Sequence, residues 1–166
     1  YRSSALAAVV LITAGTLAYL NSFNGPFVFD DEPSILGNAS IRSFATAWWP
    51  PAGGGLTVSG RPVLNLTLAL NHAISGEQVW SYHVLNLLIH LAAGLTLFGL
   101  VRRTLRQPAL AARFGGDAQS ITLTAAALWL LHPLQTASVT YVIQRAESLC
   151  ALFYLLTLYG FVRSAE

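Results

Sequence analysis

The chain has 166 residues, of which 54% are hydrophobic and 10% are charged, and its mean hydropathy is +0.56. Soluble domains carry about 25% charged residues, so this composition excludes an ordinary soluble domain and predicts an integral membrane protein. The formal charge of +2 is too small to indicate nucleic-acid binding. The single cysteine, Cys150, excludes an internal disulfide and is expected to be a small buried side chain.

Four apolar segments predict an all-α polytopic membrane protein, with residues 1–166 forming a single membrane domain. The first segment lacks the small-residue cleavage site of a signal peptide, so we interpret it as a spanning helix. The third is short and ends at the helix break His132-Pro133. We expect the spans at about residues 4–20, 80–101, 119–131 and 146–163.

A long loop, residues 21–79, separates the first two spans and is rich in Gly and Pro. Within it, residues 41–49 and 63–73 are expected to form short helices at the membrane surface, and Pro62 suits the first turn of the second one. Residues 107–117 are expected to form another loop. The run Gly53-Gly54-Gly55 lacks the Lys-Ser/Thr of a phosphate-binding loop.

The arginines predict the orientation. Six of them fall at one end of the predicted spans: Arg2, Arg102, Arg103, Arg106, Arg113 and Arg163. The positive-inside rule places this end in the cytoplasm and the acidic first loop on the periplasmic or lumenal side. Because the chain begins at Tyr1 rather than Met and stops at Glu166 just past a helix-like segment, we expect it to be a piece of a longer protein.

Three of the seven acidic residues stand together as Asp30, Asp31 and Glu32. Carboxylates at the mouth of a membrane bundle are costly unless they bind a ligand or take part in chemistry. Repulsion between neighbours would raise one pKa and suit a general base, so Asp30 and Asp31 are candidate catalytic residues. They are also candidate ligands for a divalent metal ion. The competing interpretation is a solvated cluster in which an Asp caps the helix beginning at Pro33.

Arg145 and Glu147 interrupt the fourth apolar segment on its outer side, where topology requires no charge. Because an Arg guanidinium forks onto phosphate, Arg145 and Arg61 are candidates for binding a donor phosphate or a lipid headgroup, with Glu147 beside them. An internal salt bridge between Arg145 and an acidic residue of the loop is an equally supported interpretation.

The histidines differ in their surroundings. His132 precedes a proline at the outer face and joins the candidate ligand-binding residues. His83 and His90 share a helix face but lie two turns, roughly 10 Å, apart, which is too far for joint metal ligation. His90, near the middle of a span, is expected to be a core histidine with a hydrogen-bond partner.

The order of motifs is similar to that of a known family. After the first span come FVFDDEPSI, GRPVLNLTLALNHAISG, YHVLNLLIHLAAGLTLFGLVRRTL and LLHPLQTASVTYVIQRAESLCALFYLL. Together they resemble the N-terminal part of the membrane-bound O-mannosyltransferases that carry tetratricopeptide repeats, and their bacterial relatives. These are glycosyltransferases of the C-type fold, and the resemblance covers nearly the whole chain.

The resemblance implies transfer of a sugar from a polyprenyl-phosphate carrier to a hydroxyl of a protein or glycan acceptor on the outer side. It maps the catalytic or metal-coordinating acid onto Asp30 or Asp31. It places Arg145 and Glu147 in the family's RAE-like motif and His132 in its HP motif. A bacterial inner membrane is the expected location and membrane lipids are expected partners, whereas neither a redox cofactor nor nucleic acid is expected.

A second function class stays open, because the further spans and the soluble repeat region of the family do not occur in these residues. The alternative is a non-catalytic structural subunit whose spans pack on other membrane subunits of a larger complex. A transporter fragment is less favoured, since no pair of broken helices in related halves is visible.

Overall fold

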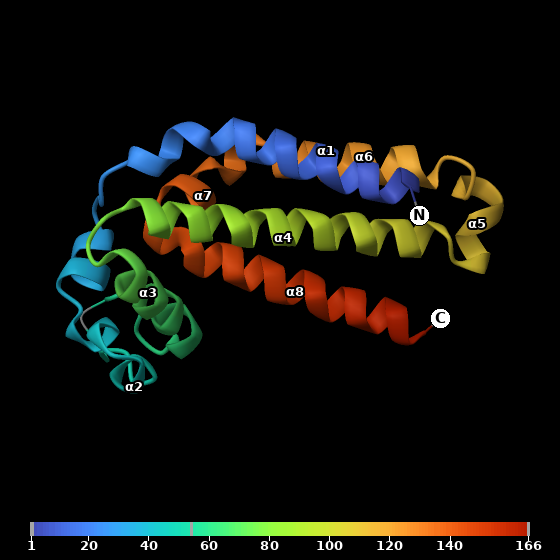
Figure 1. The fold of residues 1–166 in the computed structure, drawn as a ribbon. Coiled ribbons are helices and arrows are strands. Elements are labelled where there is room, and N and C mark those ends of the chain that lie inside the picture. The colour runs from blue at the N-terminus through green and yellow to red at the C-terminus, as the bar shows by residue number, and fades with distance from the viewer. Residues whose placement is uncertain (1, 54, 166) are drawn as a thin grey trace.

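The computed structural model describes residues 2–53 and 55–165; Gly54 of the glycine run, the two end residues and the side chain of Arg2 lie outside the described residues. In these two ranges all the regular secondary structure is helical (Figure 1), as the sequence predicts. The elements are α1 (Arg2–Tyr19), η1 (Leu20–Asn24), η2 (Glu32–Leu36), η3 (Ala39–Arg42), α2 (Phe44–Ala47), α3 (Pro62–Ser75), α4 (Trp80–Leu105), α5 (Pro108–Phe114), α6 (Ala118–Leu130), η4 (Pro133–Gln135), α7 (Thr136–Thr140), η5 (Val142–Gln144) and α8 (Arg145–Ser164).

Helix α4 is central to the bundle, and α1, α3, α6 and α8 all contact it (Figure 1). Two glycines allow the close approach of α1, α4 and α6. A Cβ atom on Gly94 would lie 2.8 Å from Leu130 Cδ1, and one on Gly15 would lie 2.7 Å from Leu91 Cδ2. Leu91 and Leu130 are themselves buried in this core. Small residues at helix crossings therefore bring these helices together, as they do in membrane bundles generally.

Three segments are long and apolar enough to cross a membrane by length and composition: Ser3–Asn24, Trp80–Leu105 and Val142–Ser164. The expected third of four spans is α6, which has only 13 residues. It is therefore about 20 Å long, whereas the hydrocarbon layer is about 30 Å thick. The count of four spans is thus not confirmed. Helix α6 still returns the chain along the bundle, so that the two chain ends lie at the same end of the molecule (Figure 1).

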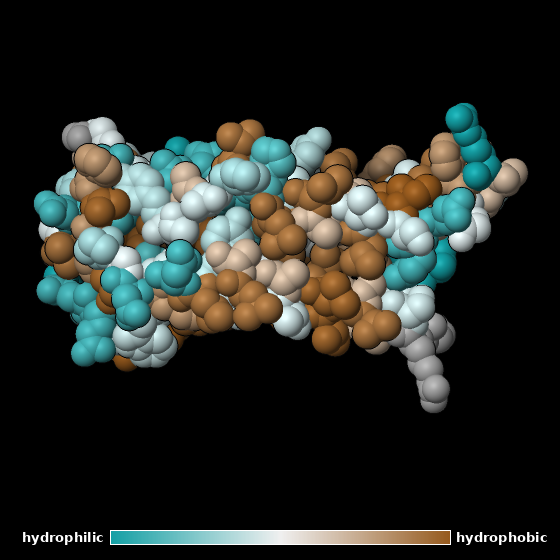
Figure 2. Space-filling model, turned by 90° about the horizontal axis from the view of Figure 1, so that it is seen from above, coloured by the Kyte–Doolittle hydropathy of each residue, from teal (hydrophilic) through white to brown (hydrophobic). Residues whose placement is uncertain are grey.

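The surface has the polarity expected of an integral membrane protein. Hydrophobic residues predominate around the middle of the face seen in Figure 2, and hydrophilic residues gather toward its two ends. Helices α1, α6 and α8 leave large apolar side chains exposed, including Leu6, Leu128 and Phe161. Such a continuous apolar belt needs a lipid or protein environment. Cys150 also differs from the prediction of a buried thiol, because it is exposed on α8.

The end of the bundle that carries the chain termini also carries arginines of the group predicted to share one end. Arg102 and Arg103 lie in the last turn of α4, and Arg163 lies in the last turn of α8. The expected loop 107–117 contains a helix, α5, which begins at Pro108 and bears Arg113 in its last turn. Proline at the first helical position has a preset φ and loses no needed hydrogen bond, which explains the start of this helix.

The break after α6 is stabilised from neighbouring helices. Pro133 cannot continue the helical hydrogen bonding, and the Leu134 N–H donates to His132 Nδ1 at 3.2 Å. The Leu130 carbonyl, freed by this break, accepts from His90 Nε2 at 2.9 Å and from the Tyr19 hydroxyl at 3.4 Å. An unpaired carbonyl at this depth would cost several kcal/mol, so these two side chains allow α6 to end there.

The predicted loop 21–79 folds as a compact outer layer on the opposite end of the bundle (Figure 1). The expected helix 63–73 is α3, with Pro62 in its first turn as predicted. The expected helix 41–49 is instead two short pieces, η3 and α2, because Ser43 is extended and its side chain caps α2. Both asparagines of Asn-X-Ser/Thr triplets are buried here, and Asn38 Nδ2 donates to Asn65 Oδ1 at 2.9 Å.

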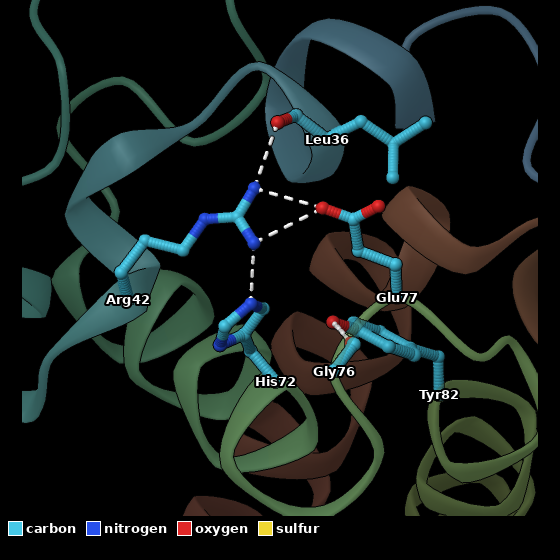
Figure 3. Close-up of polar contacts among 6 residues, drawn as sticks. All are labelled: Leu36, Arg42, His72, Gly76, Glu77 and Tyr82. Atoms are coloured by element: carbon cyan, nitrogen blue, oxygen red, sulfur yellow. Dashed lines mark hydrogen bonds and ion pairs between the residues drawn. The ribbon is translucent and has the colours of Figure 1, made fainter.

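One exposed ion pair braces the outer layer (Figure 3). Arg42 donates to Glu77 Oε1 through both terminal nitrogens at 3.1 Å. It also donates to the Leu36 carbonyl at 3.1 Å and contacts His72 Nε2. The guanidinium thereby connects η3 with the end of η2, with α3 and with the turn leading into α4.

Candidate functional site

The acidic run lies in a tight turn whose backbone is held in an unusual conformation. Phe29 has a φ of 47°, and it is the one non-glycine residue with positive φ in the described chain. Bulky residues rarely adopt this left-handed region, so the surrounding contacts must fix the turn. The Phe29 side chain is 84% exposed, with its ring 6.4 Å from that of Tyr141. Strain of this kind is concentrated at functional sites.

Asp31 is one source of that constraint. Its side chain is fully buried, and its two oxygens accept the backbone N–H groups of Val28 at 3.1 Å and of Ile143 at 2.8 Å. The carboxylate thus attaches the first loop to the chain just before α8. Burial raises the pKa of Asp31, and its hydrogen bonds to Val28 and Ile143 oppose that shift. A raised pKa at this aspartate pair was expected from repulsion between the carboxylates, whereas burial is the main cause of the raised pKa of Asp31.

Asp30 lies on the other side of the same turn and is exposed. Its backbone N–H donates to the Tyr141 hydroxyl at 3.0 Å, so the main chain is fixed while the carboxylate stays outside. The two neighbouring aspartates therefore have different environments: Asp31 is a buried backbone acceptor and Asp30 presents its charge outward. The expected helix cap is not seen at Asp31, whose side chain accepts no capping bond from η2.

A divalent metal ion finds no complete ligand set in the described residues. Both Asp31 oxygens already accept N–H groups, and within residues 2–53 and 55–165 no group of three His, Cys, Asp or Glu side chains could hold a metal ion. Divalent cations such as Ca²⁺ need about six oxygen ligands. We therefore derive no step through a metal ion.

Arg145 forms a second polar cluster, enclosed among α3, α4 and α8. Its Nε donates to Asn86 Oδ1 at 2.6 Å, Nη1 to Thr67 Oγ1 at 3.2 Å and Nη2 to the Tyr82 carbonyl at 2.9 Å. The Asn86 amide in turn donates to the carbonyls of Val139 and Val142 at 3.2 Å. All the contacts of the guanidinium are thus with neutral oxygens of the protein.

This burial changes the interpretation of Arg145. The side chain is 0% exposed, so in this structure it does not face a lipid phosphate. No carboxylate of the described residues lies within ion-pairing distance of it, so the alternative of an internal salt bridge is not seen either. A buried charge that is fully hydrogen-bonded fixes the arrangement of its neighbours, which here are three helices.

Arg61 remains available to an anion. It is exposed at the start of α3, and one terminal nitrogen donates to the Thr57 carbonyl at 3.0 Å. It borders an open apolar groove of about 320 Å³ between α3 and α8. The groove is lined by Arg61, Val63, Leu64, Leu149, Cys150 and Phe153, among others. A cation beside an apolar groove suits a lipid that bears a negative headgroup.

The remaining candidates lie apart from the acidic turn. His132 is exposed and accepts the Leu134 N–H, so it stabilises the start of η4. Glu147 is exposed in the first turn of α8 and lines a different cavity, with His90 and Gln135. His83 Nε2 hydrogen-bonds to the Gly25 carbonyl at 2.9 Å, and no hydrogen bond joins His83 to a carboxylate of the described residues. The expectation that His90 is a core histidine is confirmed.

Sequence reasoning missed two residues that organise these clusters, Tyr141 and Asn86. Tyr141 lies between the third and fourth predicted spans, and Asn86 lies within an apolar span. A polar amide in the middle of such a span is itself a signal, since buried polar groups must find partners. Asn86 could have been found in this way, but its pairing with Arg145 depends on how α4 and α8 pack.

The chain is similar to proteins named protein O-mannosyl-transferases. It is 34% identical to Tmtc2 of Drosophila melanogaster over 87% of this chain and 15% of that protein. It is 32% identical to TMTC2 of Mus musculus over 95% of this chain and 19% of that protein. It is 29% identical to TMTC4 of Homo sapiens over 95% of this chain and 23% of that protein.

No family model matches the chain, and no solved structure matches it. The chain spans about a fifth of the length of the curated relatives it matches. Over about nine tenths of its own length it is thus related to a part of the protein O-mannosyl-transferases, which confirms the resemblance read from its motifs.

Proposed function

We propose that this chain forms part of a membrane glycosyltransferase that moves a sugar from a polyprenyl-phosphate carrier to a hydroxyl group of a protein acceptor. The observation that carries the proposal is the exposed Asp30 carboxylate, on a turn fixed by Tyr141 and by the buried Asp31. A general base must be positioned and must also be accessible to its substrate. The printed names of the relatives, protein O-mannosyl-transferases, support the reaction class.

The proposed reaction assigns roles to two exposed charges, Asp30 and Arg61. The Asp30 carboxylate takes the proton of the acceptor hydroxyl while that oxygen attacks C1 of the sugar. The bond between C1 and the phosphate oxygen breaks, and its electron pair leaves with the polyprenyl phosphate. Arg61 stabilises the negative charge on that phosphate, and the apolar groove between α3 and α8 accommodates the lipid chain. Arg145 and Asp31 are positioning residues in this scheme.

The proposed location is a bacterial inner membrane, with the turn at Asp30 on the periplasmic side. The arginines at the opposite end of the bundle support this orientation through the positive-inside rule. In a Cys150→Ser background, an impermeant thiol reagent added from outside should label Ala52→Cys and should spare Ala109→Cys. Both positions are exposed, so accessibility within the protein does not limit the reagent. The reverse labelling pattern would overturn the orientation.

The second candidate is a non-catalytic subunit of a larger membrane complex. It is favoured by the large exposed apolar side chains of α8, such as Phe153 and Phe161, which a partner helix could cover. In this alternative, the same helices would pack on partner subunits and Asp30 would be a solvated loop residue.

The two candidates are separated by measuring mannose transfer from polyprenyl-phosphate mannose to a Ser/Thr peptide in membranes containing the protein. Asp30→Asn should reduce transfer by roughly 10² to 10⁴, because Asn cannot accept the proton. The matched control is Glu32→Gln, which neutralises another exposed carboxylate of the same turn and should leave transfer near the wild-type rate.

Equal transfer by wild type, Asp30→Asn, Asp31→Asn and the double variant would contradict the catalytic proposal. A complex that assembles only when this chain is present, yet transfers no sugar, would support the structural subunit instead. Loss of transfer in Asp31→Asn alone, with the protein still folded, would move the role of base from Asp30 to Asp31.

A further inference from the structure

Two cavities lie where α8 packs against α4, and these two helices run in the same direction along the bundle (Figure 1). The first cavity has a volume of about 230 Å³, and its polar side chains include those of His90, Gln135 and Glu147. The second has a volume of about 350 Å³ and lies toward the C-terminal ends of both helices. Its lining is apolar apart from Thr104, whose hydroxyl already donates to the Leu100 carbonyl at 2.9 Å.

Helix periodicity places the two cavities along one strip of the surface, which we call the α4–α8 seam. Residues three or four apart share a helix face. On α4 the series is His90, Ala93, Leu97, Leu100 and Thr104, and on α8 it is Ser148, Ala151, Leu155, Leu158 and Val162. In each series the first two members line the polar cavity and the last two line the apolar one. The polar cavity therefore continues as an apolar strip, which is about 21 Å long from His90 to Thr104.

The polar end of the seam has hydrogen-bond acceptors that the protein does not use. His90 Nε2 contacts the Leu130 carbonyl at 2.9 Å, and because a carbonyl can only accept, Nε2 carries the ring proton and Nδ1 is an acceptor. In the described residues neither this Nδ1, nor the Glu147 carboxylate, nor the side-chain oxygen of Gln135 has a hydrogen-bond partner. Glu147 is the charged group of the lining, so the cavity carries a negative charge.

We propose that the α4–α8 seam binds a lipid whose headgroup carries a primary ammonium group, as in phosphatidylethanolamine. An ammonium group has three N–H donors and no acceptor, so it complements a carboxylate, a ring nitrogen and an amide oxygen. Its positive charge also matches Glu147. The indole of Trp129 lines the same cavity, stacked on His90 with ring centroids 5.0 Å apart, and a tryptophan ring attracts a cation.

The apolar strip identifies the ligand as a lipid rather than a dissolved amine. Leu97 and Leu155, between the two cavities, are half-buried, so an acyl chain lying along the seam would cover apolar surface that the protein leaves open. The headgroup and the chain of such a lipid then each meet a surface of their own polarity. This site is separate from the groove beside Arg61, which uses a different face of α8 through Leu149 and Phe153.

The charge of the polar cavity disfavours the other ligands expected at a membrane surface. No Arg or Lys lines the cavity beside Glu147, so a phosphate placed there would be repelled. This argues against the expected assignment of Glu147 to phosphate binding. A divalent metal ion is disfavoured because no group of three His, Cys, Asp or Glu side chains that could hold one occurs in the described part of the chain.

The test uses Trp129 as a reporter in the whole chain, reconstituted in nanodiscs. Replacing Trp48, Trp49 and Trp80 by Phe leaves Trp129 as the single tryptophan. Phosphatidylethanolamine with brominated acyl chains should quench Trp129 more strongly than brominated phosphatidylglycerol at the same mole fraction, because phosphatidylglycerol has the same phosphate but no ammonium group. Glu147→Gln should lower the relative affinity for phosphatidylethanolamine by about tenfold, as expected for losing a hydrogen bond to a charged group. The control Glu32→Gln, outside the cavity, should leave the preference unchanged.

A second measurement covers the case in which the single-tryptophan protein does not fold. Native mass spectrometry of the chain with its four tryptophans should then detect retained phosphatidylethanolamine in preference to phosphatidylglycerol, and Glu147→Gln should remove that preference. Equal quenching or equal retention of the two lipids would overturn the proposal, and so would a preference that survives Glu147→Gln. A saturable response of Trp129 to dissolved ethanolamine, without any preference between the lipids, would assign the cavity to a soluble amine and would also overturn it.

Discussion

The two polar clusters near the end of the bundle opposite the chain termini differ in how their charged groups are paired (Figure 1). Around Arg145 the three nitrogens of the guanidinium group each donate to a neutral oxygen, and the side chain is completely enclosed. Around Asp30 the backbone is equally constrained, by Tyr141 and by Asp31, yet the carboxylate itself is exposed. Both clusters connect the region just before α8 to other helices or loops.

The difference teaches how to separate structural from functional charges in this molecule. A charge whose hydrogen bonds are all satisfied inside the protein holds elements together, and its removal should appear first as lost stability. A charge that is positioned but left unpaired can meet a substrate, and its removal should appear first as lost activity. Sequence position alone does not separate them, because Arg145 and Asp30 both stand out as charges at an apolar boundary.

The largest expected effect on stability is at Arg145. Arg145→Ala should lower the free energy of unfolding by about 3–5 kcal/mol, because it leaves the buried Asn86 side-chain oxygen without its donor, removes the bond to the Tyr82 carbonyl and opens a cavity. Thermal unfolding in detergent would measure it. The matched control is Arg61→Ala, an exposed arginine, which should change stability by no more than about 0.5 kcal/mol.

Arg145→Lys sharpens the same comparison. A lysine keeps the charge, but its single ammonium group cannot reproduce the planar guanidinium that donates to three acceptors, so it should recover only part of the lost stability. Stability equal to wild type in Arg145→Ala would show that the cluster does not hold α3, α4 and α8 together. Arg145 could then no longer be contrasted with Asp30 as a charge that stabilises the fold.

The next effect concerns the two neighbouring aspartates. Asp31→Ala should destabilise the protein by about 1–3 kcal/mol, because the N–H groups of Val28 and Ile143 lose their acceptor in a buried position. Asp30→Ala should change stability by less than about 0.5 kcal/mol, since its side chain is exposed. Chemical unfolding of the two variants side by side would measure the difference. Equal destabilisation would show that the aspartates do not have the separate roles argued above.

Much of the fold could be predicted from composition and periodicity. The helix breakers Ser75-Gly76 and His132-Pro133, the proline before α3 and the apolar stretch of α4 all determine local structure, so the helices follow from neighbouring residues. The helix after Gln107 was missed because its seven residues carry too little apolar pattern. The bounds of α6 agree with the predicted segment 119–131 to within one residue, but its 13 residues do not confirm that it spans the membrane. A short helix can return a chain along a bundle without matching the hydrocarbon thickness.

The candidate site could be predicted only as a group of residue types. The motif singled out the turn at Asp30 and Asp31 as the candidate site. The burial of Asp31 and the exposure of Asp30 could not be predicted, because Asp31 is held by Ile143, which is 112 residues away. Arg145 was expected either to bind a headgroup phosphate or to form an internal salt bridge, because it interrupts an apolar run. Its actual partners come from α3 and α4, and only the packing of three helices brings them together.

The smallest expected effect is the pH dependence contributed by Asp31. Burial raises the pKa of Asp31 in the folded protein above its ordinary value. Between the unfolded and the folded pKa the native state therefore binds more protons than the unfolded state, and stability falls as the pH rises through this window. The contribution of Asp31 is fully present below the ordinary Asp pKa and is lost above the folded one.

Asp31→Asn removes it, so the stability difference between wild type and Asp31→Asn should shift against wild type as the pH is raised. Exposed Asp30 provides the matched control: the difference between wild type and Asp30→Asn should change less over the same range. A difference for Asp31→Asn that favours wild type more at higher pH would mean that its two backbone hydrogen bonds outweigh burial, and it would place Asp31 with the satisfied charges, beside Arg145.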